Sequence, residues 1–262
     1  MEREFELIGA TAIEDQLQDN VSQTIQRIRR AGVKVWMLTG DKKETAINIG
    51  ISCGLLETDM AVLEWQDTVE QTLKAKEEYG LRQCCLVASG EDLLRPVEEK
   101  LLLELVNSCS AVICCRVTPK QKQDMVWLMR KNKCTTLAIG DGANDVNMIN
   151  TAHVGIGIKG VEGAQAALCS DYAITEFQMV GELMLYHGRE CYRKNSQLIL
   201  FNFYKNMILV LPQFWYGLYN NFSSATIYDP WVHQLYNVAF TSFPIMLFAI
   251  YDQQYSVRRS LA

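Results

Sequence analysis

The chain has 262 residues, of which 49% are hydrophobic and 21% are charged, and its formal net charge is −5. This length and apolar content allow one globular domain of ordinary size together with a smaller second part. The lack of net positive charge argues against nucleic acid as a partner, because its phosphates are bound mainly by lysine and arginine.

Up to Glu190, short apolar runs alternate with amphipathic stretches, and the junctions carry Gly, Asp or Pro. This alternation predicts an α/β fold, a Rossmann-like parallel sheet with helices on both faces. The predicted strands are Val33 to Leu38, Ala111 to Cys115, Thr135 to Ile139, Val154 to Ile158 and Tyr172 to Ile174. The predicted helices are Val21 to Arg30, Glu44 to Cys53, Pro119 to Asn132 and Glu176 to Tyr186, and Gly32 and Gly54 are expected to stop the first two.

The segment from about 57 to 110 has a charged, irregular pattern with one expected helix, Glu98 to Val106. We interpret it as a peripheral insertion. The nine cysteines, two pairs of which are adjacent, include no CxxC spacing. They are expected to be buried small hydrophobes in a reducing compartment.

After Lys194 the composition becomes strongly apolar in two stretches, each with about the 20 residues that a helix needs to cross a bilayer. The predicted order is a domain over 1–190, a basic segment 191–196, a membrane helix 197–220, an exoplasmic loop 221–230, a membrane helix 231–251 and a cytoplasmic tail 252–262. Basic residues flank the pair, with Arg189, Arg193 and Lys194 before it and Arg258 and Arg259 after it. They place both ends and the α/β domain in the cytoplasm. The alternative is two buried helices of a soluble domain.

Three predicted strands end in residues suited to phosphate chemistry. Thr39-Gly40-Asp41 follows the first strand and precedes a helix, and the amides at a helix start can hold phosphate oxygens. Asp141 and Asp145, separated by Gly142, Ala143 and Asn144, suit a hard cation such as Mg²⁺. Taken singly, the first could be an ordinary loop and the second a hairpin turn with a helix cap.

The third strand end is Arg116 to Lys122, where Lys122 can place an ammonium against a transferring phosphoryl group. A solvated lysine in a first helical turn is the alternative. Together the three groups resemble the haloacid dehalogenase superfamily, in which an aspartate on an earlier strand attacks the phosphoryl group. Thr39 matches the second motif of that family, Lys122 the third, and Asp141 with Asp145 the fourth.

Longer segments resemble phospholipid-translocating P-type ATPases, the flippases. They are Gly9 to Asp15, Val35 to Lys42, Cys114 to Val117, Gly140 to Ile149 and Ala152 to Ile158. The resemblance implies Mg²⁺ and ATP as cofactors, with Asp141 and Asp145 at the metal. It further implies a nucleotide and phosphate site lined by Thr39, Gly40, Asp41, Arg116, Lys122, Asn144 and Asp145, of which Thr39, Lys122, Asp141 and Asp145 serve catalysis.

The first apolar stretch contains Asn202, Lys205 and Asn206, and neither stretch contains an acidic residue in its interior. Polar side chains within a bilayer should face protein or water. A polar, uncharged path with one cation suits a phospholipid headgroup, so we predict that these three residues line its route. The alternative is that Lys205 serves only helix packing. Pro212 and Pro244 are expected to interrupt the two helices.

The sequence contains no Asp-Lys-Thr-Gly-Thr motif, so it lacks the aspartate that is phosphorylated in the family. We therefore predict that the chain is part of a flippase and is inactive by itself. The alternative is a complete, non-catalytic membrane protein that binds a full-length flippase; a soluble phosphatase fits less well, because it would need the same aspartate. The expected partners are a phospholipid and an accessory glycoprotein subunit. We further expect a multi-pass membrane protein of an endomembrane or the plasma membrane.

Overall fold

A computed structural model of the chain describes residues 16–57, 59–65, 72, 74, 77, 83–93, 99–160 and 164–254. The chain divides into two compact units, Met1–Val180 and Gly181–Ala262. The first unit thus ends before residue 190, where the sequence placed the end of the α/β domain. The expected flippase-like segment Gly9 to Asp15 and the basic pair Arg258 and Arg259 lie outside the described residues.

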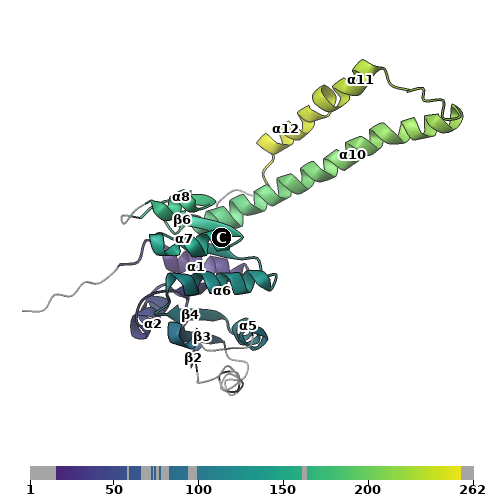
Figure 1. Cartoon of the computed structure of the whole chain (residues 1–262). Helices are drawn as coiled ribbons and strands as arrows, with labels where there is room; N and C mark the ends of the chain where they lie inside the picture. The colour runs from purple at the N-terminus through teal and green to yellow at the C-terminus, as the bar shows by residue number, and fades with distance from the viewer. Residues whose placement is uncertain are drawn as a thin grey trace, which may run out of the picture. The chain divides into compact units, whose positions relative to one another are not determined.

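The first unit alternates strands and helices along the chain (Figure 1). Its strands are β1 (Trp36–Leu38), β2 (Ala61–Glu64), β3 (Cys84–Ser89), β4 (Ala111–Cys115), β5 (Leu137–Gly140), β6 (Val154–Ile158) and β7 (Tyr172–Ile174). Its helices are α1 (Val21–Arg30), α2 (Lys43–Ser52), α4 (Gly90–Leu93), α5 (Glu99–Ser108), α6 (Pro119–Lys131), the 3₁₀ turn η1 (Ala143–Asp145), α7 (Val146–Thr151), α8 (Gln165–Cys169) and α9 (Met179–Gly181), where the second unit follows.

All strand pairs of the described residues are parallel, which confirms the predicted α/β class. One sheet has the order β1-β4-β3-β2 and the other the order β5-β6-β7. In the first sheet Trp36 lies opposite Val112 and Leu38 opposite Cys114. Because parallel strands point the same way, their carboxyl ends lie along one edge of each sheet.

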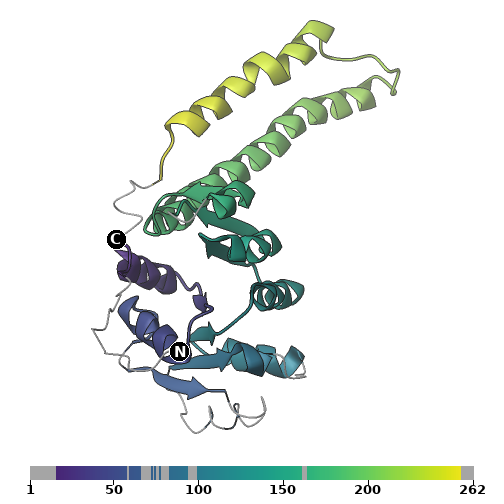
Figure 2. The ribbon, with the colours of Figure 1, turned by 60° about the vertical axis from the view of Figure 1, so that its left-hand side comes forward.

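Side chains of β4 alternate between two apolar cores. Val112 and Cys114 pack with Leu105 of α5, whereas Ala111 and Ile113 pack with residues of α1 and α2 on the other face. Figure 2 shows helices beside these strands. Leu38 at the end of β1 packs against a third core around Ala138 of β5, which links the two sheets.

The interpretation of 57–110 as a peripheral insertion is wrong for the strands within it. β3 lies between β2 and β4, and five of its six residues are buried, so it is an inner strand of the sheet. The reason is that a strand buried on both faces has no polar alternation, and its apolar run is too short to indicate a strand. Helix α5, by contrast, confirms the helix expected near 98–106.

Several predicted bounds are confirmed within two residues. α1, β4, β6 and β7 have the predicted limits, and β1 is shorter than predicted at its start. Gly32 and Gly54 follow α1 and α2 with φ of 84° and 71°, values that favour glycine and end a helix. Six of the nine cysteines are buried, as expected, while Cys169 and Cys191 are exposed. Burial raises the pKa of the thiols of Cys85 and Cys114 to about 12, so both stay protonated and unreactive.

The second unit is a helical hairpin. It begins with a π-helix, η2 (Glu182–Gly188), which replaces the end of the helix predicted for 176–186. The long helix α10 (Arg189–Tyr219) follows, then α11 (Pro230–Leu235), the π-helix η3 (Tyr236–Phe240) and α12 (Ser242–Tyr251). Figures 1 and 2 show α11 and α12 returning alongside α10.

Pro212 lies inside α10, which continues through it, so the expected interruption there is wrong. Pro244 lies within α12, and the irregular segment precedes it. Among the described residues, one helical stretch, Pro230–Tyr251, is long and apolar enough to cross a membrane. α10 does not meet that criterion because polar and charged residues interrupt its apolar run.

Candidate functional site

The loop after β1 is closed by its own side chains. The Thr39 hydroxyl donates a hydrogen bond of 2.7 Å to the Asp41 carboxylate, and the Asp41 amide donates back to Thr39 Oγ1 at 3.2 Å. Helix α2 starts two residues later, and its N-cap residue Lys42 makes no side-chain capping bond. The first amides of α2 therefore remain available to an anion.

Backbone hydrogen bonds tie this loop to the end of β4. The Thr39 amide donates to the Cys114 carbonyl at 2.9 Å, and the Val117 amide donates to the Thr39 carbonyl at 3.1 Å. The Arg116 amide donates to the Asp41 carbonyl at 2.9 Å. Arg116 has φ of 51°, a left-handed conformation that is uncommon outside glycine. These three backbone hydrogen bonds thus hold the exposed Arg116 beside the Thr39 to Asp41 loop.

Lys122 is placed by the start of α6. Thr118 and Gln121 form a capping box, with the Thr118 amide donating to Gln121 Oε1 at 2.8 Å and the Gln121 amide donating to Thr118 Oγ1 at 3.3 Å. Pro119 occupies the first helical position, which suits its fixed φ. From this fixed first turn, Lys122 Nζ reaches Asp145 Oδ1 at 2.8 Å, and the two side chains are only 13% and 14% exposed. The structure therefore brings together two residues that are 23 positions apart in the sequence.

Asp145 folds back over the end of β5 through the turn η1. A Cβ atom at Gly140 would lie 2.4 Å from the Asp145 Cβ and 2.7 Å from its Oδ2. Only glycine therefore allows this approach. Because Leu38 packs on the core of β5, the loops after β1 and β5 belong to one region of the first unit.

Asp141 and Asn144 are exposed at the same strand end. The Asp141 carboxylate makes no hydrogen bond with any described residue, so its oxygens can bind a cation. The described residues contain no group of three or more His, Cys, Asp or Glu that could hold a metal. The loop after β5 can thus offer two carboxylate ligands, Asp141 and Asp145. Two protein ligands fit Mg²⁺, because this ion usually keeps water and phosphate oxygens as its other ligands.

Two supporting residues were not predicted from the sequence. The Gln121 amide donates to the Gly90 carbonyl at 2.6 Å, and a Cβ at Gly90 would lie 2.4 Å from the Arg116 carbonyl oxygen. The end of β3 therefore packs directly beneath the Arg116 turn. The Thr-Pro-Lys-Gln sequence could have indicated the capping box, but no pattern indicated Gly90.

Two protein-family models match the chain. The model of haloacid dehalogenase-like hydrolases matches residues 2–153, and the model of the C-terminal part of phospholipid-translocating P-type ATPases matches residues 167–262. The chain belongs to the haloacid dehalogenase-like hydrolases, and its C-terminal part matches the phospholipid-translocating P-type ATPases.

Curated relatives extend this similarity over the whole chain. It is 44% identical to "Phospholipid-transporting ATPase C887.12" of Schizosaccharomyces pombe, with 97% of this chain and 22% of the relative covered. It is 45% identical to "Phospholipid-transporting ATPase DRS2" of Saccharomyces cerevisiae, with 98% and 20% covered. It is 40% identical to "Probable phospholipid-transporting ATPase IM" of Homo sapiens, with 100% and 25% covered. The chain thus spans about a fifth to a quarter of the length of these phospholipid-transporting ATPases.

The polar residues predicted for a lipid path lie on α10, within the part of the chain that matches the P-type ATPase model. Asn202 and Asn206 are exposed, and Lys205 is half-buried. The carbonyl of Lys205 accepts a hydrogen bond of 3.0 Å from the Tyr236 hydroxyl of η3. The structure therefore shows one helix-to-helix contact at Lys205 that the sequence did not indicate.

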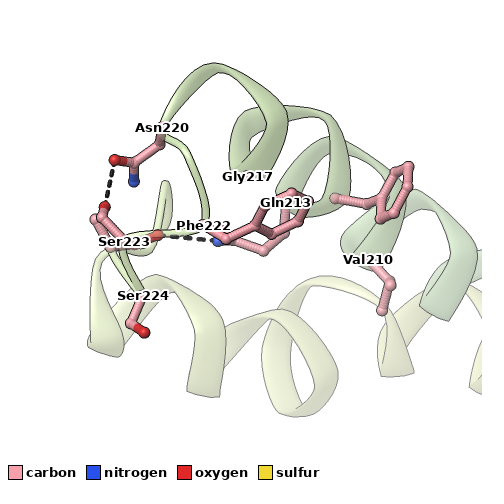
Figure 3. A pocket seen from close by; sticks show the side chains of 9 residues that line it. Val210, Gln213, Gly217, Asn220, Phe222, Ser223 and Ser224 are labelled. Atoms are coloured by element: carbon pink, nitrogen blue, oxygen red, sulfur yellow. Dashed lines mark hydrogen bonds between the residues drawn. The ribbon is translucent and has the colours of Figure 1, made fainter.

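A hollow of about 420 Å³ lies where α10 turns into the linker (Figure 3). Gln213 lines it and uses both ends of its amide on the linker, donating to the Ala225 carbonyl at 3.1 Å and accepting from the Ile227 amide at 2.9 Å. A Cβ at Gly217 would lie 3.1 Å from the Phe222 ring, so the turn is closely packed. Gln213 thus holds the linker in place.

Proposed function

We propose that this chain is the part of a phospholipid-transporting P-type ATPase that holds Mg²⁺ and the transferring phosphoryl group and continues into two membrane helices. The parent protein would couple ATP hydrolysis, through an aspartyl-phosphate, to translocation of a phospholipid across a membrane. The observation that carries the proposal is the Lys122–Asp145 pair at 2.8 Å, which joins the first turn of α6 to the loop after β5. A non-catalytic protein would have no chemical need for this pair, which favours the catalytic parent over the alternative of a binding protein.

In the proposed reaction, a carboxylate oxygen of an aspartate absent from this sequence bonds to the γ-phosphorus of ATP. The bond from that phosphorus to the β–γ bridging oxygen breaks, and ADP leaves; water later releases phosphate. The Thr39 hydroxyl, the Gly40 amide and the start of α2 would bind phosphoryl oxygens. Lys122 would offset the negative charge that gathers there.

Mg²⁺ would neutralise phosphoryl charge and orient the group for in-line attack. Asp141 and Asp145 would hold the ion, and Lys122 would keep Asp145 oriented toward it. Asn144, Asp41 and Arg116 would complete the nucleotide and phosphate site. The left-handed backbone of Arg116 supports this role, because strained conformations of this kind gather at binding sites.

The test uses a full-length relative whose matching segment is replaced by this chain. Asp141→Asn removes one carboxylate ligand, and we expect the Mg²⁺ concentration for half-maximal phosphoenzyme formation to rise about tenfold or more. Phosphoenzyme is measured as acid-stable label from ATP. Asp124→Asn, on the exposed face of α6, is the matched control. An unchanged Mg²⁺ requirement in Asp141→Asn would contradict the proposed metal site.

The second unit is proposed to be a membrane hairpin. α10 has 31 residues, or about 46 Å of helix, which exceeds the roughly 30 Å of bilayer hydrocarbon. Large apolar side chains along both helices are exposed, among them Phe203 at 69%, Val238 at 75% and Ile250 at 65%. Such surfaces are stable in lipid and costly in water. Arg189, Arg193 and Lys194 at the base support a cytoplasmic location for both ends.

Labelling from the two sides tests this topology. In sealed vesicles of a variant with Cys134 and Cys169 changed to serine, a membrane-impermeant maleimide should reach Cys191, at the base of α10, only from the cytoplasmic side. A Ser224→Cys variant, in the linker, in which Cys191 is also changed to serine, should be labelled only from the opposite side. Both positions are exposed, so access depends on the membrane alone. Labelling of both from the same side would exclude a spanning hairpin.

The lipid route is proposed to pass Asn202, Lys205 and Asn206 on α10. Amide groups and a single cation can bind the polar and anionic parts of a phospholipid headgroup within a bilayer. The expected partners of the whole protein are ATP, Mg²⁺, the phospholipid and a small accessory glycoprotein subunit. The whole protein would be a multi-pass membrane protein with its α/β domain in the cytoplasm.

A further inference from the structure

The second helix of the hairpin is irregular at one place. η3 is a π-helix, in which the Thr241 amide donates to the Tyr236 carbonyl at 3.0 Å, five residues back. The Thr241 hydroxyl donates to the same carbonyl at 2.8 Å, and the Ser242 hydroxyl donates to the Asn237 carbonyl at 2.6 Å. The side-chain hydroxyls of Thr241 and Ser242 thus supply additional hydrogen bonds to two carbonyls of the wider turn.

Pro244 explains why the irregularity occurs there. Proline has no N–H, and its ring clashes with the carbonyl four residues earlier in a continuous helix. Because η3 ends at Phe240 and α12 starts at Ser242, Pro244 falls in the first turn of a new helix, where proline is tolerated. Pro244 therefore favours a change of helix geometry just before it, and π-helical segments are frequent at functional sites.

The same segment supplies a contact to α10. Tyr236, the first residue of η3, donates its hydroxyl to the Lys205 carbonyl at 3.0 Å, and the contact is partly buried. Between residues 197 and 215 of α10, the half-buried residues are Phe201, Lys205, Leu209 and Gln213, which recur every four positions. Lys205 therefore lies on the face of α10 that packs against the second helix. A carbonyl oxygen has two lone pairs, so it can accept this bond and its own helical bond together.

We infer that Tyr236 is a positioning residue for Lys205. Its hydroxyl fixes the backbone of Lys205 against the π-helix, and so sets the depth and direction from which the ammonium meets an anionic headgroup. The inference rests on the proposed lipid route. The shared chemistry of the ligand is the anionic phosphate ester, which all glycerophospholipids carry and which a lysine can bind as a point charge.

The test again uses a full-length relative that carries this chain. Tyr236→Phe removes only the hydroxyl, and we expect the apparent KM for lipid in lipid-stimulated ATP hydrolysis to rise about two- to tenfold. The thermal unfolding midpoint and the phosphoenzyme level without lipid should stay unchanged. Tyr204→Phe is the matched control, because Tyr204 adjoins Lys205 and its hydroxyl makes no hydrogen bond with a described residue.

A double-mutant cycle with Lys205→Met, which removes the ammonium and keeps the main-chain carbonyl, separates positioning from packing. If Tyr236 acts through the Lys205 ammonium, the change in KM from Tyr236→Phe should be much smaller in the Lys205→Met background. Equal changes in both backgrounds, or a lowered unfolding midpoint with unchanged KM, would overturn the inference. Unchanged lipid transport in Lys205→Ala would instead contradict the proposed lipid route itself. Failure of the route can therefore be distinguished from failure of the role inferred for Tyr236.

Discussion

Asp145 is held at the end of β5 by two contacts of different kinds. Its carboxylate pairs with Lys122, and its Cβ packs over Gly140, where no side chain fits. The first contact supplies charge compensation in a partly buried place, and the second fixes the height of the carboxylate above the strand. The geometry of the proposed metal site therefore depends on a residue that has no functional group.

Gly140→Ala should displace Asp145, because the new Cβ would lie 2.4 Å from the Asp145 Cβ. We expect a loss of about 1–3 kcal/mol in the free energy of unfolding, as for other overpacked sites. Urea unfolding of the chain in detergent, followed by tryptophan fluorescence, measures this loss. Gly142→Ala in the same loop is the control, since the nearest atom to its Cβ would be 3.9 Å away. Equal effects of the two changes would contradict the role assigned to Gly140.

Sequence motifs predicted the residues of the proposed site, but not the residues that pack beneath them. Thr39, Lys122, Asp141 and Asp145 follow strands whose ends could be recognised from local pattern. Gly90 could not be recognised, because its role depends on the approach of the Arg116 carbonyl from a strand 26 residues later in the chain. Contacts of this kind depend on tertiary packing, so no residue spacing in the sequence indicates them.

At the scale of elements, sequence periodicity succeeded where a strand or helix has its own boundaries. β4, β6 and α1 are confirmed because Gly, Asp or Pro punctuates each of them. β2 and β3 were missed because their short apolar runs occur among charged residues, and pairing with β4 decides their conformation. The π-helix η3 was anticipated only as an interruption near Pro244, since hydroxyls at 241 and 242 determine where it falls.

The base of the hairpin is closed by a cluster of charges around Arg193. Its guanidinium donates to Asp252 Oδ2 at 2.5 Å and to Glu190 Oε2 at 3.0 Å, and Lys194 donates to the Ala249 carbonyl at 2.8 Å. The hydrogen bond from Arg193 is the main cause that lowers the pKa of Glu190, with a further contribution from the charge of Lys194. The cluster therefore joins the start of α10 to the end of α12.

At acid pH, the contact between the start of α10 and the end of α12 should loosen. A carboxylate with a lowered folded pKa stabilises the fold fully above its unfolded pKa, about 4.3 for Glu. That stability is lost as the pH falls through the folded pKa, so the base should stay closed at neutral pH and loosen below about pH 4. Spin labels on Cys191 and on a Gln253→Cys variant, with Cys134 and Cys169 changed to serine, would report the distance between the two helix ends.

Arg193→Met should broaden that distance distribution already at neutral pH. Arg193→Lys keeps the charge but loses the planar fork that bonds both carboxylates, so an intermediate result is expected. A narrow distribution in Arg193→Met would show that apolar packing of the helices alone closes the base.

At the scale of the whole molecule, the two sheets leave their site-bearing strands at an edge. Among the described residues, β1 pairs only with β4, and β5 only with β6. Both strands carry proposed phosphate ligands at their carboxyl ends, yet the family nucleophile, an aspartate on an earlier strand, has no counterpart in this sequence. The chain would thus hold the charge-compensating half of the proposed reaction centre, in which the Asp41 and Asp145 carboxylates already have hydrogen-bond partners.

The isolated chain should therefore release no phosphate from ATP and Mg²⁺ and should acquire no acid-stable label. Asp41 accepts from Thr39 and Asp145 from Lys122, which lowers the nucleophilicity of both carboxylates. Asp141 is the exposed exception, so a label that disappeared in Asp141→Asn would reveal an unexpected nucleophile and overturn the prediction. The same 262 residues within a full-length relative serve as the positive control. Label in that protein and none in the isolated chain is the expected pair of results, because phosphoryl transfer needs both the positioned charges and the missing carboxylate.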